Sequence, residues 1–304
     1  MDVLTEGNIL DESDLTILRV YALKFEEHLT DKAFNNLSFT FPQSPIASLK
    51  NTEKHVQFLS GFQPVHYHCC PSSCICYTGP YEPFDKCLKC NTDCYKVDGM
   101  TPQVIFKYLS IIHCLHAMLV SSSCMTKMQY RSKHKDDLMK ITDIFDSTHY
   151  HLLQETFIMI SNEKLPTWFF PNPCGIALRL STDGFGPFKH CTKTAWPIIL
   201  FNYNLPPKER FLKRNIISIG VIPEPKRPCN FNSFLWPLVQ ELLQLKIGVS
   251  AFNAITKVIF LLHVYLIIIF GDIPAVSMIM RMKGHNVISP CCMCTIKGVC
   301  ISSL

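Results

Sequence analysis

The sequence predicts a mixed α/β fold, of the α/β to α+β type, on three observations. Three apolar, strand-like runs follow one another at 176–182, 196–203 and 216–222, and turn residues end each run. An amphipathic helix is predicted at 232–245, and a further apolar run follows it. Seven cysteines crowd residues 65–94, ahead of the predicted sheet, which indicates a separate cysteine-rich segment.

The order of these elements narrows the fold class. Along the first run, alternate residues from Ile176 to Thr182 share one face, so Asp183 reverses onto the other face. Three strands, a helix and another strand are the order of an RNase H-like core. In such a core the first strand and the strand after the helix lie side by side. We therefore predict an incomplete RNase H-like catalytic core within residues 161–304.

Two aspartates follow strand-like runs directly. Asp183 is followed by Gly184, and Asp272 is followed by Ile273-Pro274, which are turn signals. Carboxylates at the ends of two neighbouring strands can together hold divalent metal ions for phosphoryl transfer. The sequence therefore predicts that Asp183 and Asp272 are catalytic residues and ligands of Mg²⁺ or Mn²⁺.

The cysteine-rich segment, 61–99, carries two pairs of thiols at zinc-ligand spacing. Cys70-x3-Cys74 is followed a dozen residues later by Cys87-x2-Cys90. Each pair fits one tight turn, and the chain between them can fold back to complete a tetrahedral Zn²⁺ site. The expected role is structural, because four protein ligands leave no open position; a cluster of free thiols is the alternative. Further candidate ligands remain open: His66, His68, Cys69, Cys76 and Cys94.

The composition and the N-terminal sequence indicate which class of protein to expect and in which compartment. With 48% hydrophobic and 17% charged residues, the chain favours a packed core over wholesale disorder. A net charge of +5 is compatible with a nucleic-acid partner, but many other soluble proteins carry such a charge. The acidic N-terminus lacks the apolar region of a signal peptide, so we expect a protein that is not secreted and cysteines that are reduced.

The N-terminal region, 1–60, is predicted to combine helices and a linker. Apolar residues recur at helical spacing in 13–29, and a short helix is expected at 51–59. The polar range 35–50 contains two prolines and is interpreted as the linker. No chemistry is assigned to this region.

A helical connecting region, 100–160, is predicted next. It is expected to begin at Thr101-Pro102, because proline is favoured at the first position of a helix. Its second part, 126–145, carries basic side chains that can face a phosphate backbone. A solvated helix face, balanced by Asp136 and Asp137, is the interpretation that we favour. The basic residues are Lys127, Arg131, Lys133, Lys135 and Lys140.

The apolar run 258–270 raises the question of a membrane span. It is shorter than the ~20 apolar residues that cross a bilayer, and it contains His263. β-Branched residues crowd its second half, so we predict a buried helix-to-strand segment and no membrane partner.

Several sequence motifs between residues 63 and 298 resemble those of the transposases of CACTA-type (En/Spm-like) DNA transposons. The motifs are YHCCPSSCICYTGPY, LSTDGFGPF, AWPIILFNYNLPP, GVIPEPKRP, NSFLWPLVQELLQL and GDIPAVSMIMRMKGHN followed by PCCMC. Their number and order make the resemblance specific, since no single motif would be enough. Two positions depart from the family: Cys292 stands where a basic residue is usual, and no arginine follows the pair Cys87 and Cys90.

The resemblance implies a DDE transposase with an RNase H-like catalytic domain. Asp183 matches the first catalytic acid of the family and Asp272 the second. The third acid lies downstream in the family and is not found before Leu304, so we expect a truncated and inactive fragment. Glu241 is the one nearby carboxylate that we consider for the third position, and a solvated helix residue is its favoured interpretation.

The resemblance also implies a cysteine–histidine segment after Asp272. Cys291-x2-Cys294 matches a pair of the family, and His285 lies nearby. These three residues are candidate ligands of a second zinc ion. Cys300, or residues beyond the sequence, would have to complete the set.

Two functions compete. The first is a transposase that cuts and joins transposon-end DNA in the nucleus, here as a fragment that would be cytoplasmic if it is non-functional; self-association into a homo-oligomer is left open. The alternative is a non-catalytic zinc-binding module that contacts DNA or protein through residues 63–160. A membrane-anchored cysteine-rich protein is a weaker third interpretation.

Overall fold

The computed structural model describes residues 10–137, 139–186, 194–223, 227–282, 288–289, 294 and 296–297. The chain forms two compact units, 1–63 and 64–304, which are treated in turn as the N-terminal unit and the sheet unit. Two of the predicted ligands of a second zinc ion, His285 and Cys291, lie outside the described residues.

Three helices make up the described part of the N-terminal unit. Asp11 caps the first helix, since its carboxylate accepts a hydrogen bond from the backbone N–H of Asp14 at 2.7 Å. Thr30 caps the second helix in the same way through Ala33. The helices expected at 13–29 and 51–59 are confirmed. The three helices are α1 (Glu12–Glu26), α2 (Asp31–Thr40) and α3 (Leu49–Ser60).

Helix α2 shows that the linker predicted at 35–50 was partly wrong. The first six residues of that range are helical, and the loop before α3 begins at Phe41. The ring of Phe34 is fully buried and holds α2 in the unit. The polar composition concealed this helix, because one buried aromatic ring is a weak periodic signal.

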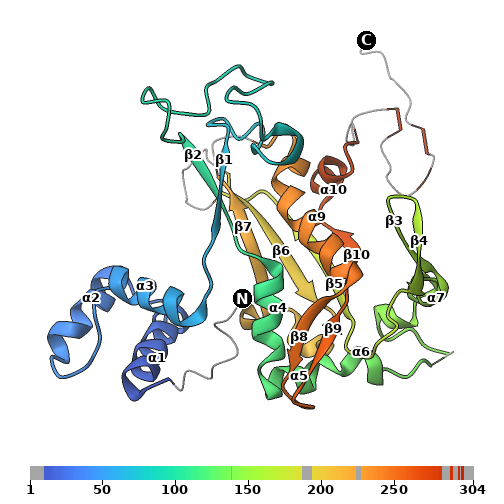
Figure 1. The fold of residues 1–304 in the computed structure, drawn as a ribbon, viewed down its shortest axis with the longest axis horizontal. Helices are drawn as coiled ribbons and strands as arrows, with labels where there is room; N and C mark the ends of the chain where they lie inside the picture. The colour runs from blue at the N-terminus through green and yellow to red at the C-terminus, as the bar shows by residue number, and fades with distance from the viewer. Residues whose placement is uncertain are drawn as a thin grey trace, which may run out of the picture. The chain divides into compact units, whose positions relative to one another are not determined.

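A six-stranded mixed sheet is the centre of the sheet unit (Figure 1). Its strand order is β1-β2-β7-β6-β5-β10, in which β5 and β10 are parallel and the other neighbouring pairs are antiparallel. The mixed α/β class is therefore confirmed. The strands are β1 (Val65–Cys69), β2 (Val104–Tyr108), β5 (Ile176–Thr182), β6 (Trp196–Asn202), β7 (Ile216–Ile222) and β10 (Val264–Phe270).

The central part of this sheet agrees with the sequence-based prediction. Strands β5 and β7 have the predicted bounds, and β6 ends one residue earlier than predicted. The predicted helix is α9 (Phe231–Ile247). The adjacency expected between the first strand and the strand after the helix is confirmed, because β10 pairs with β5.

The apolar run 258–270 is not the helix-to-strand segment that was predicted. It consists of β9 (Val258–Leu262) and β10, which are separated by His263. Strand β9 turns back on β8 (Val249–Asn253) in a two-stranded hairpin. β-Branched and aromatic residues favour extended backbone along the whole run, so the helical part of the prediction was wrong.

The connecting region also begins differently from the prediction. Residues 104–108 are strand β2 rather than the first turns of a helix, and β2 joins β1 to the central sheet. The rings of Phe106 and Tyr108 are buried on one face of β2, at the period-two spacing of a strand. Helix α4 (Ile111–Leu119) starts later, where the Ser110 hydroxyl caps it.

The two faces of the sheet are covered by different elements. Helices α4 and α9 lie across one face, where Leu178 and Leu180 of β5 join one core with Leu115 and Phe234 of the helices (Figure 1). The opposite face is covered by a smaller aromatic core. Its buried members are Phe145, Tyr150, Ile158, Phe170, Ala177, Tyr203 and Tyr265.

None of the helices in the described part of the chain has the length and apolar character that a membrane-spanning helix requires.

Short elements complete the sheet unit. The remaining elements are η1 (Gly79–Tyr81), α5 (Ser122–Met128), α6 (Tyr130–Lys133), η2 (Ile144–Asp146), α7 (Thr148–Glu155), β3 (Phe157–Ile160), β4 (Glu163–Trp168), α8 (Pro207–Arg210), η3 (Lys213–Asn215) and α10 (Ile273–Ile279).

Candidate metal-binding sites

Asp183 and Asp272 lie beyond the same end of two adjacent parallel strands. The last pair in the register of β5 and β10 joins Ser181 to Phe270. Asp183 follows Ser181 by two residues and Asp272 follows Phe270 by two residues, so the aspartates are in step along the two strands. Neighbouring strands are about 4.8 Å apart, which brings the two positions to one short stretch of the sheet edge.

Two glycines beside these aspartates have close neighbours. A Cβ at Gly271 would stand 3.1 Å from the carbonyl oxygen of Thr182, which shows that the residues just before the two aspartates are in contact. A Cβ at Gly184 would stand 2.5 Å from the ring of Trp196. A larger residue at Gly271 would therefore press on the end of β5, and one at Gly184 would displace the Trp196 ring of β6.

The two carboxylates are exposed and differ in their partners. Asp272 is the N-cap of α10, and its Oδ1 accepts a hydrogen bond from the backbone N–H of Ala275 at 2.7 Å. Among the described residues, no hydrogen bond to the Asp183 carboxylate is observed. Both side chains reach solvent, and carboxylate oxygens are the ligands that Mg²⁺ and Mn²⁺ prefer.

Glu241 is half-buried and is engaged by residues other than this pair. Its Oε2 accepts hydrogen bonds from the Tyr108 hydroxyl at 2.9 Å and from the backbone N–H of Ile111 at 2.7 Å. The carboxylate therefore ties α9 to the first turn of α4. This contact, together with burial, raises the pKa of Tyr108, with burial the larger cause. Glu241 has a structural role in the described contacts.

The structure brings the four predicted cysteines together. The sulfur atoms of Cys70, Cys74, Cys87 and Cys90 all lie within 4.8 Å of one another, and the first three side chains are buried. A tetrahedral zinc ion with Zn–S bonds of about 2.3 Å requires sulfur separations of about 3.8 Å. The four residues fit a metal such as zinc. We call residues 70–90 the four-cysteine loop.

The four thiols differ in their acidity. Hydrogen bonding to the Thr92 side chain lowers the pKa of Cys90 to about 6, so this exposed thiol is largely a thiolate at neutral pH. Burial raises the pKa of Cys70 to about 11, and burial also raises that of Cys74. Zinc binds thiolates, so a metal would displace protons chiefly from the buried members of the group.

The four-cysteine loop is fastened to the start of α9. The Ser73 hydroxyl donates to the carbonyl oxygen of Pro223, just after β7. The backbone N–H of Asn230 donates to the carbonyl oxygen of Cys74 at 2.8 Å, and the backbone N–H of Cys76 donates to the Ser233 hydroxyl at 2.8 Å. The loop and the six-stranded sheet are therefore parts of one packed unit.

Sequence reasoning missed one thiol beside the group. The exposed thiol of Cys229 contributes to the raised pKa of Cys74, for which burial is the larger cause. It is 139 residues away from the nearest predicted ligand in the chain, Cys90, so spacing alone gave no signal. The alternates that the sequence left open are not part of the four-sulfur group among the described residues. They are His66, His68, Cys69, Cys76 and Cys94.

Of the predicted second zinc set, only Cys294 is described, as an exposed free cysteine. A different group of possible ligands consists of His134, Asp136 and Asp146. In it, the His134 ring contacts the Asp146 carboxylate at 2.5 Å, and this hydrogen bond is the main cause of the lowered pKa of Asp146. The backbone N–H and the hydroxyl of Thr142 also donate to that carboxylate, so it is largely satisfied within the protein.

The basic face considered at 126–145 is smaller than the sequence suggested. Arg131 is buried and donates to the carbonyl oxygens of Gly175, Asn172 and Pro173. It therefore anchors the segment before β5 and does not face solvent. Lys127 pairs with Glu209 at 3.1 Å.

Residues 160–303 match the family model described as transposase family tnp2. The match starts at the end of β3 and includes Asp183, Asp272 and strands β5, β6, β7 and β10, but not the four-cysteine loop. It covers a little under half of the chain and supports a transposase-like function for the part that it covers. No curated protein matches the sequence significantly.

Proposed function

We propose that this chain is a transposase-like protein that resembles the DDE enzymes, which cut and join transposon-end DNA. The register of β5 and β10 carries the proposal, because it sets Asp183 and Asp272 in step at one edge of the sheet. The match to transposases over 160–303 supports the same function. The strand order β7-β6-β5-β10, with one parallel pair, agrees with an RNase H-like core, and the resemblance favours the CACTA type and a nuclear location.

In this proposal the two carboxylates bind Mg²⁺ or Mn²⁺. When bound, such ions neutralise charge on the phosphate and activate the attacking hydroxyl. Asp272 keeps one oxygen for Ala275 and offers the other, while α10 fixes the direction of its side chain. Asp183 is held by the buried strand β5 and offers both oxygens. The protein thus supplies pre-oriented negative charge at a fixed edge.

A polypeptide limited to these 304 residues is proposed to have little or no strand-transfer activity. Two of three acids are identified, and Glu241 is occupied by Tyr108 and Ile111. Zinc in the four-cysteine loop is proposed as a structural cofactor. Nicking of a transposon-end duplex with Mg²⁺, lost on Asp183→Ala, would contradict the proposed inactivity while supporting the site.

The site is tested by Mn²⁺ binding, followed by electron paramagnetic resonance of the free ion. We expect Asp183→Asn and Asp272→Asn each to weaken Mn²⁺ binding by at least about tenfold, since each removes one anionic ligand. Glu163→Gln, an exposed carboxylate at the start of β4, is the matched control and should leave binding unchanged. Equal Mn²⁺ affinity in all four proteins would exclude the aspartate pair as the metal site.

A further inference from the structure

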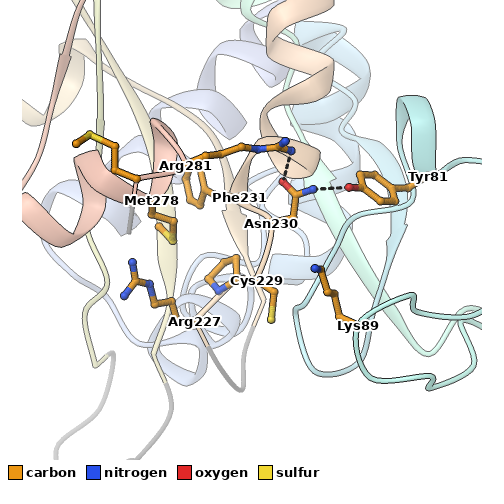
Figure 2. A pocket seen from close by; sticks show the side chains of 10 residues that line it. Tyr81, Lys89, Arg227, Cys229, Asn230, Phe231, Met278 and Arg281 are labelled. Atoms are coloured by element: carbon orange, nitrogen blue, oxygen red, sulfur yellow. Dashed lines mark hydrogen bonds between the residues drawn. The ribbon is translucent and has the colours of Figure 1, made fainter. Parts of the chain in front are cut away.

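A cavity of about 450 Å³ lies where three segments of the sheet unit meet (Figure 2). The four-cysteine loop contributes Tyr81 and Lys89, the chain before α9 contributes Arg227 and Cys229, and the end of α10 contributes Arg281. Figure 2 shows Lys89 and Arg227 on opposite sides of Cys229. A space of this volume is large enough for a nucleotide-sized group.

The lining of the cavity is positively charged and contains no acidic side chain among the described residues. Lys89, Arg227 and Arg281 are all exposed. Within the described part of the chain, none of the three forms an ion pair with a carboxylate. Three like charges around one space repel one another, so the arrangement favours an anionic ligand.

Arg281 occupies a backbone position that glycine normally fills. It follows the C-cap of α10 with φ 54°, and the N–H of Met282 bonds to the carbonyl of Ser277, as in a Schellman motif. A side chain other than glycine is disfavoured in this left-handed region. The backbone conformation at the end of α10 therefore does not by itself favour an arginine at this position.

Neutral partners hold the guanidinium of Arg281 in place. Asn230 accepts a hydrogen bond from Arg281 at 3.1 Å and donates from its own amide to the Tyr81 hydroxyl at 2.7 Å, as the dashed lines in Figure 2 show. These contacts orient the side chain without neutralising it. A fork of N–H groups fixed in this way suits the oxygen atoms of a phosphate.

Arg227 connects the cavity to the aspartate pair. Its guanidinium donates to the carbonyl oxygen of Pro274 at 3.3 Å, in the first turn of the helix that Asp272 caps. Arg281 follows the other end of the same helix. The seven residues of α10 span about 10 Å, so a chain bound in the cavity lies within a few nucleotides of Asp272.

We propose that this cavity binds a backbone phosphate of a DNA strand, with Lys89, Arg227 and Arg281 as its ligands. The identity of the strand as substrate DNA rests on the proposed function, whereas the anion site rests on the cavity itself. The four-cysteine loop then has a second task besides stability, because it carries Lys89 to the cavity.

The experiment measures binding of a short fluorescein-labelled single strand of mixed sequence by anisotropy, as a function of salt. We expect Arg281→Gly to weaken binding about five- to tenfold and to reduce the salt slope by about 1, because one phosphate contact is lost. Glycine suits the left-handed backbone, so this variant should fold at least as well as the wild type, which a melting curve checks. Lys89→Gln and Arg227→Gln should weaken binding to a similar extent.

Lys107→Gln on β2 is the matched control, since Lys107 is exposed and lies outside the cavity lining. It should change binding by less than about twofold, because Lys107 makes no contact with a phosphate in the cavity and the effect of an exposed charge is weakened by salt. Unchanged binding in Arg281→Gly, or an equal loss in Lys107→Gln, would overturn the proposal. Inorganic phosphate that displaces the oligonucleotide at equal concentration would also overturn it, because the site would then select a free anion.

The same variants separate this proposal from the function on which it rests. Arg281→Gly should keep the Mn²⁺ affinity of the wild type, and Asp272→Asn should keep the affinity for the oligonucleotide in the absence of divalent metal. If Arg281→Gly binds the oligonucleotide as well as the wild type does, while the aspartate variants weaken Mn²⁺ binding as expected, only the phosphate site is excluded. If the aspartate variants bind Mn²⁺ as well as the wild type does, while Arg281→Gly weakens oligonucleotide binding, only the proposed function is excluded.

Discussion

The four-cysteine loop and the aspartate pair are built in opposite ways. The four sulfur atoms come from residues 70–90, three are buried, and their mutual distances are set by two tight turns. Asp183 and Asp272 are exposed, lie 89 positions apart in the chain, and approach one another only because β5 and β10 pair. The first site is local and the second depends on the whole sheet.

This difference teaches where each site draws its stability. A local cluster of thiols gains its order from a bound ion, since a preformed set of thiolates rarely exists in the unfolded chain. A pair of exposed carboxylates is held by the backbone below it, and the side chains themselves contribute little to folding. The two regions should therefore respond very differently to substitution and to metal removal.

Metal removal is the largest expected effect. Structural zinc contributes about 10–16 kcal/mol of apparent binding free energy in small domains, so we expect a strong chelator to lower the Tm of the sheet unit by at least about 10 °C. Metal analysis should find about one zinc per chain before treatment. Cys124→Ser is the control, because its half-buried thiol lies outside the group, and it should not change the zinc content. An unchanged Tm in zinc-free protein would contradict the structural role.

Alkylation of the metal-free protein is the next effect in size. With the pKa of Cys90 lowered to about 6 and that of Cys70 raised to about 11, iodoacetamide at pH 7 should modify Cys90 about 100-fold faster, after allowance for the lower nucleophilicity of the more acidic thiol. The rate at Cys90 should rise with pH through about 6 and then level off. Peptide mass spectrometry measures both residues, and zinc should protect them. Equal rates at pH 7 would show that the loop is not preformed.

Removal of the cap on α10 is a smaller effect. Asp272→Ala should lower the free energy of unfolding by about 1 kcal/mol, because the backbone N–H of Ala275 loses its acceptor. Asp272→Asn should change it by only a few tenths, since asparagine also caps helices. Urea unfolding compares the two variants. A cost for Asn as large as that for Ala would mean that charge, rather than capping, stabilises this end of the helix.

Substitution of the other aspartate is the smallest effect on stability. Asp183→Asn should change the free energy of unfolding by less than about 0.5 kcal/mol, because the carboxylate is exposed and follows the strand. Its Mn²⁺ affinity should nevertheless fall as proposed above. A large loss of stability would instead assign Asp183 a part in folding.

The sequence predicted most of the central sheet, the pairing of the two strands that precede the aspartates, and the four-cysteine group. Apolar runs ended by turn residues identified β5, β6 and β7, and the thiol spacing identified the four cysteines that the structure brings together. Strand β2 was mistaken for a helix because Thr101-Pro102 was interpreted as a helix start, although Phe106 and Tyr108 follow a period of two. That β1 and β2 would extend the central sheet could not be predicted, since the β2–β7 pairing joins residues more than 100 positions apart.

The basic cavity also could not be predicted from the sequence. Lys89, Arg227 and Arg281 come from three separate segments, and none of them stands in a run of like charges on one face. The position of Arg281 after α10 had no sequence signal, because a left-handed residue is recognised by its backbone angle and not by its type. Such a site can be recognised only when the structure shows how the three segments that form it lie relative to one another.

The fastening of the four-cysteine loop to α9 has a thermodynamic consequence. Hydrogen bonds from Asn230 to Cys74 and from Cys76 to Ser233 join the loop to the first turn of the helix that packs under the sheet. Any free energy released when an ion is captured by the thiols is then shared with that helix by linkage. The supply of metal in the cell would therefore affect the stability of the elements that support the two aspartates, although these residues lie far from the cysteines in the sequence.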